Sequence, residues 1–129
     1  IMGTWCPNCR DEINVLKEIE QNYGKDQIEI YSIAFEKYRD EKEAIALLKK
    51  YKKIMNFDWP LLLGGYANKT ETSEILNFVD KIYSYPTLLI LDKSNRINHI
   101  HTGFYGPATS RHEEFKESLF QRIEEEIKK

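Results

Sequence analysis

Two kinds of hydrophobic spacing alternate along this 129-residue chain, and the alternation leaves few architectures open. Residues 28–35 and 87–91 are rich in β-branched and other apolar side chains, as is typical of strands. Around them, apolar residues recur every three or four positions, as on the buried face of a helix. Strands that alternate with helices indicate an α/β fold with a layered sheet. The length suits one domain, and no repeat or linker-like tract divides it.

Four helices are expected from apolar spacing and from residues that favour helix ends. The first begins at Pro7 and ends at Gly24, and the second follows an N-cap at Asp40. The third starts near Thr72 and the last near Ser110. The buried face of the third helix is predicted to contain Ile75, Leu76, Val79 and Ile82.

The remaining strands are predicted from shorter segments. Residues 59–63 form a short extended piece, which Gly64 and Gly65 end. The apolar run at 87–91 suits a strand that is covered on both faces. After turn-forming residues at 92–96, residues 97–101 are expected to return as a second strand. This hairpin would add an antiparallel edge to the sheet, and residues 103–107 would form a loop.

Cys6 and Cys9 are the two cysteines of the chain, and the C-x-x-C spacing allows half a zinc site, a structural crosslink or a working dithiol. We expect Cys6 at the N-cap of the first helix, since Pro7 fits its first turn. Unpaired backbone N–H groups and the helix dipole there stabilise a thiolate, so the pKa of Cys6 is expected to be depressed. Cys9, one turn further, is expected to be more enclosed. Cys6 is therefore predicted to attack a disulfide through an exposed sulfur, partly covered by Trp5, and Cys9 to resolve the mixed disulfide.

A metal site is the alternative use of the cysteines. Structural zinc takes four ligands, and the further candidates are His99, His101 and His112. Their spacing does not match that of a zinc finger, and a strand would place His99 and His101 on one face. We therefore predict no metal, and expect these histidines to be surface residues near an edge strand.

Composition also limits the partners. The formal net charge of −2 argues against nucleic acid, because phosphate binding requires an excess of Lys and Arg. No stretch approaches the ~20 apolar residues of a membrane helix, and no signal peptide is visible.

The motifs resemble those of thioredoxin-like proteins of the TlpA/ResA type. The segment Trp5–Arg10, with Glu12 after it, is similar to the W-C-P-x-C-R-x-E motif of that family. Residues Tyr85–Thr87 match its cis-proline segment, before the penultimate strand. Residues Asp92–Arg96 resemble its D-K-x-G-x turn, with Asn95 at the glycine position, and Gly103 resembles the glycine that ends its last strand.

The resemblance implies a thiol–disulfide oxidoreductase with a thioredoxin-like fold, a mixed central sheet with flanking helices. Its redox group would be the dithiol itself, with no other cofactor. Its partners would be protein thiols and disulfides, together with an upstream electron donor. The family is typically extracytoplasmic, often membrane-anchored and usually reductive. The residues assigned to the site are Cys6 and Cys9 as reacting thiols, Trp5, Pro7 and Asn8 beside them, and Tyr85, Pro86 and Gly103 for substrate binding.

In that family a central strand leads into the C-x-x-C segment, and here Ile1 and Met2 are what remains of it. We therefore expect residues 1–129 to form a single domain that is incomplete at its N-terminal side. Relatives carry an acidic residue on that strand, and Glu12 is expected to form a surface ion pair rather than to replace it. The alternative function is a peptide-binding module whose cysteines are idle, metal-bound or permanently bridged.

Overall fold

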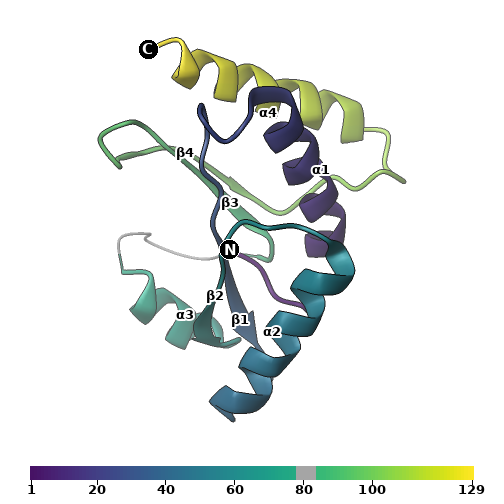
Figure 1. Ribbon diagram of the computed structural model, residues 1–129, viewed down its shortest axis with the longest axis vertical. Coiled ribbons are helices and arrows are strands. Elements are labelled where there is room, and N and C mark those ends of the chain that lie inside the picture. Colours follow the sequence, from purple (N-terminus) through teal and green to yellow (C-terminus); the bar gives the residue numbers. More distant parts are fainter. Residues whose placement is uncertain (78–83) are drawn as a thin grey trace.

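The computed structural model describes residues 1–77 and 84–129, and it confirms the α/β class. In Figure 1, α1 and α4 lie beside the β3–β4 hairpin, while α2 and α3 lie on opposite sides of β1 and β2. The elements in chain order are α1 (Pro7–Tyr23), β1 (Ser32–Glu36), α2 (Glu41–Met55), β2 (Leu61–Tyr66), α3 (Lys69–Ile75), β3 (Thr87–Leu91), β4 (Ile97–Thr102) and α4 (His112–Ile127).

The sheet consists of two halves that meet at the first two residues. Strands β1 and β2 pair in parallel, and β3 and β4 pair antiparallel. Met2 forms a parallel bridge with Ala34, and its N–H donates to Ile33 O at 2.9 Å. On the other side, Ile1 and Thr87 exchange two backbone hydrogen bonds of 2.8 and 3.0 Å. The N-terminus therefore lies between the two halves, as Figure 1 shows.

A groove of about 840 Å³ lies beside this junction, and residues 28–33 and 88–93 are among those that line it. The prediction that residues 87–91 are covered on both faces is wrong. Thr87 is buried, Leu88, Leu89 and Ile90 are half-buried, and Leu91 is exposed. The strand borders an open groove along much of its length, which leaves its apolar side chains incompletely covered.

The core is divided by α1, which has buried residues on two sides. On one side Cys9 and Ile13 pack with Met2 and Ala34. On the other, Val15 and Ile19 pack against Leu119 of α4 and partly buried side chains of β3. Burial of an aliphatic side chain stabilises the fold by about 1.5–3 kcal/mol. The helix that carries the two cysteines is thus anchored along its length.

The predicted limits of the first helix and the predicted start of the second are confirmed. Cys6 is the N-cap of α1 and has an extended backbone, Pro7 occupies the first turn, and Gly24, with φ of 76°, ends the helix. The side chain of Asp40 accepts hydrogen bonds from the backbone N–H groups of Lys42 and Glu43 at the start of α2. Such side chains satisfy N–H groups that have no partner within the helix.

The third helix begins earlier than predicted, at Lys69 rather than near Thr72. Asn68 caps it by accepting from the backbone N–H groups of the second and third helical residues, a signal that apolar spacing does not contain. Thr72 consequently lies inside the helix and is fully buried, whereas Ile75 is exposed. Leu76 is buried as expected, and the predicted contributions of Val79 and Ile82 lie outside the described residues.

Two strands also differ from their predicted limits. The first is shorter, since residues 28–31 precede β1, and the second continues through Gly64 and Gly65 instead of ending there. The pairing of β1 with β2 shifts register between Ala34 and Phe35. A Cβ at Gly64 would lie 2.6 Å from the ring of Phe35, so this position requires glycine for the strands to approach.

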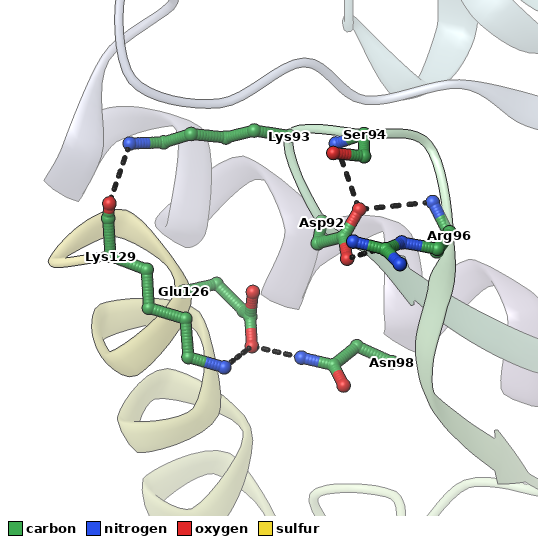
Figure 2. A network of polar contacts seen from close by, with 7 residues as sticks. All are labelled: Asp92, Lys93, Ser94, Arg96, Asn98, Glu126 and Lys129. Atoms are coloured by element: carbon green, nitrogen blue, oxygen red, sulfur yellow. Dashed lines mark hydrogen bonds and ion pairs between the residues drawn. The ribbon is translucent and has the colours of Figure 1, made fainter.

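The turn between β3 and β4 follows the predicted chemistry. The side chain of Asp92 accepts from the backbone N–H groups of Ser94 and Arg96 at 2.8 and 3.0 Å (Figure 2). Asn95 adopts the left-handed conformation, with φ of 61°, which asparagine tolerates better than most residues.

The same turn is attached to the C-terminal end of α4. Lys93 Nζ donates to the backbone oxygen of Lys129 at 3.2 Å, and Asn98 donates to Glu126, which also pairs with Lys129 (Figure 2). Exposed pairs of this kind contribute little stability. Their effect is to fix the end of α4 against the hairpin.

Candidate active site

The two cysteines form a close pair at the start of α1, with Cys6 as N-cap and Cys9 in the first turn. The backbone N–H of Cys9 donates to Cys6 Sγ at 3.2 Å. A hydrogen bond from the Cys9 thiol, together with backbone N–H groups of Cys9 and Asn8, lowers the pKa of Cys6 to about 7. The same thiol contact and burial raise the pKa of Cys9. The asymmetry has the direction that the helix position predicts.

The sulfur of Cys6 is less accessible than expected. Cys6 is 5% exposed and Cys9 is 1% exposed, so the prediction of an exposed sulfur at Cys6 is wrong, although Cys6 is the more accessible of the pair. Cys6 Sγ lies 3.7 Å from the backbone oxygen of Tyr85. Trp5 packs edge-on against the ring of Tyr85, with the ring centroids 5.1 Å apart. Tyr85, just before β3, thus contacts both the sulfur of Cys6 and the ring of Trp5.

The structure brings the predicted proline segment to the cysteines. The Tyr85–Pro86 peptide bond is cis. Pro86 O accepts from the N–H of Gly103 at 2.8 Å, which joins the two predicted substrate-binding segments to each other. The hydroxyl of Tyr85 contacts that of Thr72 at 2.9 Å. Tyr85 is therefore held both by α3 and by its contact with Cys6.

Pro7 and Asn8 were assigned to the neighbourhood of the dithiol, and both are exposed at the first turn of α1. They border the two sulfurs without covering them. Asn8 contributes through its backbone N–H, which stabilises the Cys6 thiolate. This arrangement is what a helix N-terminus offers to an anion.

Glu12 does not form the surface ion pair that was expected. It is 5% exposed, and its Oε2 has no hydrogen-bond partner among the described residues. Glu12 follows Cys9 by three residues, so both side chains lie on the same inward face of α1. They line the same groove, and burial raises the pKa of Glu12 to about 7. The i, i+3 spacing was the sequence signal for this position.

Glu12→Gln is expected to change how stability depends on pH. The pKa of Glu12 rises from 4.5 to about 7 on folding, so its stabilising contribution is complete below pH 4.5 and is lost as the pH rises to about 7. Wild type should therefore lose about 3 kcal/mol relative to Glu12→Gln over this interval. Urea unfolding of the reduced proteins at several pH values measures the difference. Parallel curves for the two proteins would show that Glu12 titrates as in the unfolded chain.

Other residues near the dithiol were missed because their types suggested no role there. The side chain of Glu36 is fully buried and contacts Thr4, two positions before Cys6. Tyr51 of α2 is buried in the same cluster as the cysteines, and burial raises its pKa to about 12. Only their tertiary positions identify them.

The histidines lie away from the cysteines. His99 and His101 share one face of β4, as expected, and line a separate pocket against α4. They are half-buried rather than fully at the surface, and burial lowers the pKa of each. Across residues 1–77 and 84–129, no three His, Cys, Asp or Glu side chains are placed to hold a metal ion.

Comparisons with known proteins give the same picture as the geometry. A family model described as thioredoxin-like matches residues 1–97. The thioredoxin-like protein YneN of Bacillus subtilis is 27% identical over 102 residues, which are 78% of this chain and 52% of that protein. The chain therefore spans about half the length of this relative.

A solved structure is similar over almost the whole chain. It is the crystal structure of a protein assigned as thiol:disulfide interchange protein DsbE from Chlorobium tepidum. The TM-score is 0.69 at 17% identity, and the match covers 98% of this chain and 75% of the other. At this identity the likeness concerns the fold. The family model matches most of the chain, and the structure places the cysteine pair at the start of a helix. This protein therefore belongs to the thioredoxin-like family.

Proposed function

We propose that this protein is a thiol–disulfide oxidoreductase that reduces protein disulfides through Cys6 and Cys9. The observation that carries the proposal is the hydrogen bond from Cys9 N–H to Cys6 Sγ at the start of α1, together with the lowered pKa of Cys6. A thiolate is the nucleophile in disulfide exchange, and a thiol with pKa near ambient pH combines ionisation with reactivity.

The reaction proceeds in two exchanges. The Cys6 thiolate attacks one sulfur of the substrate disulfide, so a mixed disulfide forms while the other substrate sulfur leaves as a thiolate and takes a proton. Cys9 then loses its proton and attacks Cys6 Sγ, which releases the second substrate thiol and forms the Cys6–Cys9 disulfide. Two electrons pass from the dithiol to the substrate. An upstream dithiol donor returns two electrons and restores the reduced pair.

Glu12 is proposed to exchange a proton with Cys9. The raised pKa of Cys9 means that its thiol must be deprotonated before the second exchange. Glu12 is the buried carboxyl group on the same helix face, and its pKa of about 7 lets it accept and return a proton near neutral pH. A base with a much higher pKa would keep the proton, and a base with a much lower pKa would not accept it.

The substrate is proposed to lie along the segment before β3. The backbone of Tyr85 faces Cys6, and an extended peptide paired with it would bring its own sulfur to Cys6. Main-chain pairing of this kind gives affinity with little dependence on sequence. The N–H of Gly103 already donates to Pro86 O. Gly103 would therefore contact a substrate through its carbonyl or its α-carbon.

The reductive direction and an extracytoplasmic location are proposed from the family resemblance. No helix of the described residues combines the length and the apolar character of a membrane span. An anchor outside this chain is compatible with the proposal. Measurement of the reduction potential of the pair against glutathione would establish the direction, because reductases have the more negative potentials.

The Cys9→Ser variant is expected to test the mechanism by trapping its intermediate. Without the resolving thiol, Cys6 should remain joined to a substrate such as insulin with intact disulfides, in a mixed disulfide that reductant cleaves. Non-reducing electrophoresis and mass spectrometry detect the adduct. The Cys6→Ser/Cys9→Ser variant is the matched control, since it keeps the surface and removes both thiols.

The same experiment separates this function from a peptide-binding module. A module would bind the substrate equally well in Cys9→Ser and in the double variant, with no covalent adduct in either. Absence of an adduct at a pH above 7, where the thiolate is populated, would therefore contradict the oxidoreductase proposal.

A further inference from the structure

A fully buried carboxyl group lies at the end of β1 that faces the active site. Glu36 is the last residue of the strand and is 0% exposed. Burial of an ionisable side chain is costly unless its oxygens are hydrogen-bonded or paired with a cation. None of the ion pairs in the described part of the chain includes Glu36. Its position therefore depends on hydrogen bonds.

Both of these hydrogen bonds go to one residue. The backbone N–H of Thr4 donates to Glu36 Oε2 at 2.8 Å, and the hydroxyl of Thr4 donates to Oε1. Thr4 stands two positions before Cys6, in the loop that enters α1. The carboxyl group thus holds a single residue of that loop through its backbone N–H and its side-chain hydroxyl.

The neighbours of Glu36 hold the next residue of the loop. Trp5 Nε1 donates to the backbone oxygen of Phe35 at 2.8 Å, and Lys37 Nζ lies 4.4 Å from the centre of the Trp5 ring. A Cβ at Gly3 would lie 2.3 Å from Trp5 Nε1, which shows how closely the loop is packed there. Phe35 and Glu36 at the end of β1, with Lys37 directly after it, therefore hold the segment just before the cysteine pair.

We propose that Glu36 is a positioning residue, which fixes the Thr4–Trp5 segment so that Cys6 Sγ stays in line with the backbone N–H of Cys9. The proposal rests on the function proposed above. The stabilisation of the thiolate depends on the 3.2 Å contact between Cys6 Sγ and Cys9 N, because hydrogen bonds weaken steeply with poor geometry. A loop released from Glu36 would lose this alignment while α1 itself remained folded.

Glu36→Met and Thr4→Val remove the tether in two ways. Methionine keeps the volume and loses both acceptors, whereas valine keeps the shape of Thr4 and loses the hydroxyl. The pH midpoint of Cys6 alkylation by iodoacetamide, read by peptide mass mapping, is expected near 7 in wild type. In Glu36→Met it is expected to rise by about one unit, which lowers the alkylation rate at pH 7 about fivefold. Thr4→Val is expected to show a smaller rise.

Glu36→Gln is the conservative variant that distinguishes a tether from a charge effect. Its amide oxygen can accept from the backbone N–H of Thr4, and its amide N–H can donate to the hydroxyl. We expect a midpoint close to that of wild type. A shift in Glu36→Gln as large as in Glu36→Met would overturn the tether, as would an unchanged midpoint in both Glu36→Met and Thr4→Val. If Glu36→Met does not fold, Thr4→Val decides between these outcomes.

Ser32→Ala is the control for general destabilisation. Ser32 begins the same strand, is buried, and accepts from Trp59 Nε1 at 2.9 Å. Its loss is expected to lower stability without moving the Cys6 midpoint, and a comparable shift in Ser32→Ala would contradict a specific role of Glu36. Alkylation requires no substrate disulfide. A wild-type protein without reductase activity would therefore disprove the proposed function and leave this test intact.

Discussion

Replacement of Cys6 by serine is expected to reduce dithiothreitol-coupled insulin reduction to the rate of dithiothreitol alone. A serine hydroxyl cannot form the mixed disulfide, so both exchanges are blocked at the first step. Loss of a nucleophile commonly lowers turnover by at least about 10³-fold. Cys6 is proposed as the reacting thiol because its sulfur accepts a hydrogen bond from Cys9 N–H and because it is the more accessible of the two cysteines. The measurement is the onset of insulin precipitation at pH 7.

The control for this variant is its own folding. Serine is only slightly smaller than cysteine, and its hydroxyl can still accept the hydrogen bond that caps α1. The urea midpoint of reduced Cys6→Ser should therefore remain near that of wild type. Activity that persists in a folded Cys6→Ser protein would mean that Cys9 is the attacking thiol. The assignment of the two roles would then be reversed.

Phe35→Ala is expected to cause the largest loss of stability among single substitutions of the core. Phe35 is fully buried and forms a core cluster with Leu76, against which Ile33 of β1 and Leu89 of β3 pack. The edge of its ring fills the space over Gly64, where no side chain fits. Truncation of a buried phenylalanine leaves a cavity and costs about 3–5 kcal/mol. Urea unfolding of the reduced protein, followed by tryptophan fluorescence, measures this change.

Ile54→Ala is the matched control for that measurement. Ile54 lies on α2 and is 61% exposed, so its truncation removes few contacts. The free energy of unfolding should change by no more than about 0.5 kcal/mol. A loss below 1 kcal/mol in Phe35→Ala would show that the two halves of the sheet are not joined through this ring.

Local chemistry made parts of the fold predictable. Asp40 marks a helix start because its carboxylate accepts from unpaired N–H groups of the first turn, and Pro7 does so because it lacks an N–H and has a fixed φ. Both starts are found where predicted. The depressed pKa of Cys6 follows from the same reasoning, since it depends on one helix end and three residues of spacing. Asn95 adopts the left-handed conformation because asparagine tolerates it better than most residues, which is an equally local property.

Tertiary burial of polar residues was not predictable in the same way. Glu12, Glu36 and Thr72 are types that usually face solvent, yet all three are buried. Glu12 lines the same groove as Cys9, Glu36 contacts Thr4, and Thr72 contacts Tyr85. What buries them is contact with segments distant in sequence, which periodicity does not specify. Ile75 illustrates the converse, because it follows the helical spacing of apolar residues and is nevertheless exposed as the last residue of α3.

The junction at Ile1 and Met2 has a consequence for recognition. Thr4 and Trp5 are attached to β1, whereas Tyr85 leads into β3, so the two sides of the reaction site belong to different halves of the sheet. Among the described residues, Ile1 bonds to Thr87 of β3 and Met2 bonds to β1. A peptide bonded to Cys6 and paired with Tyr85 would therefore contact both halves of the sheet, so that capture of a substrate would add a second connection between them.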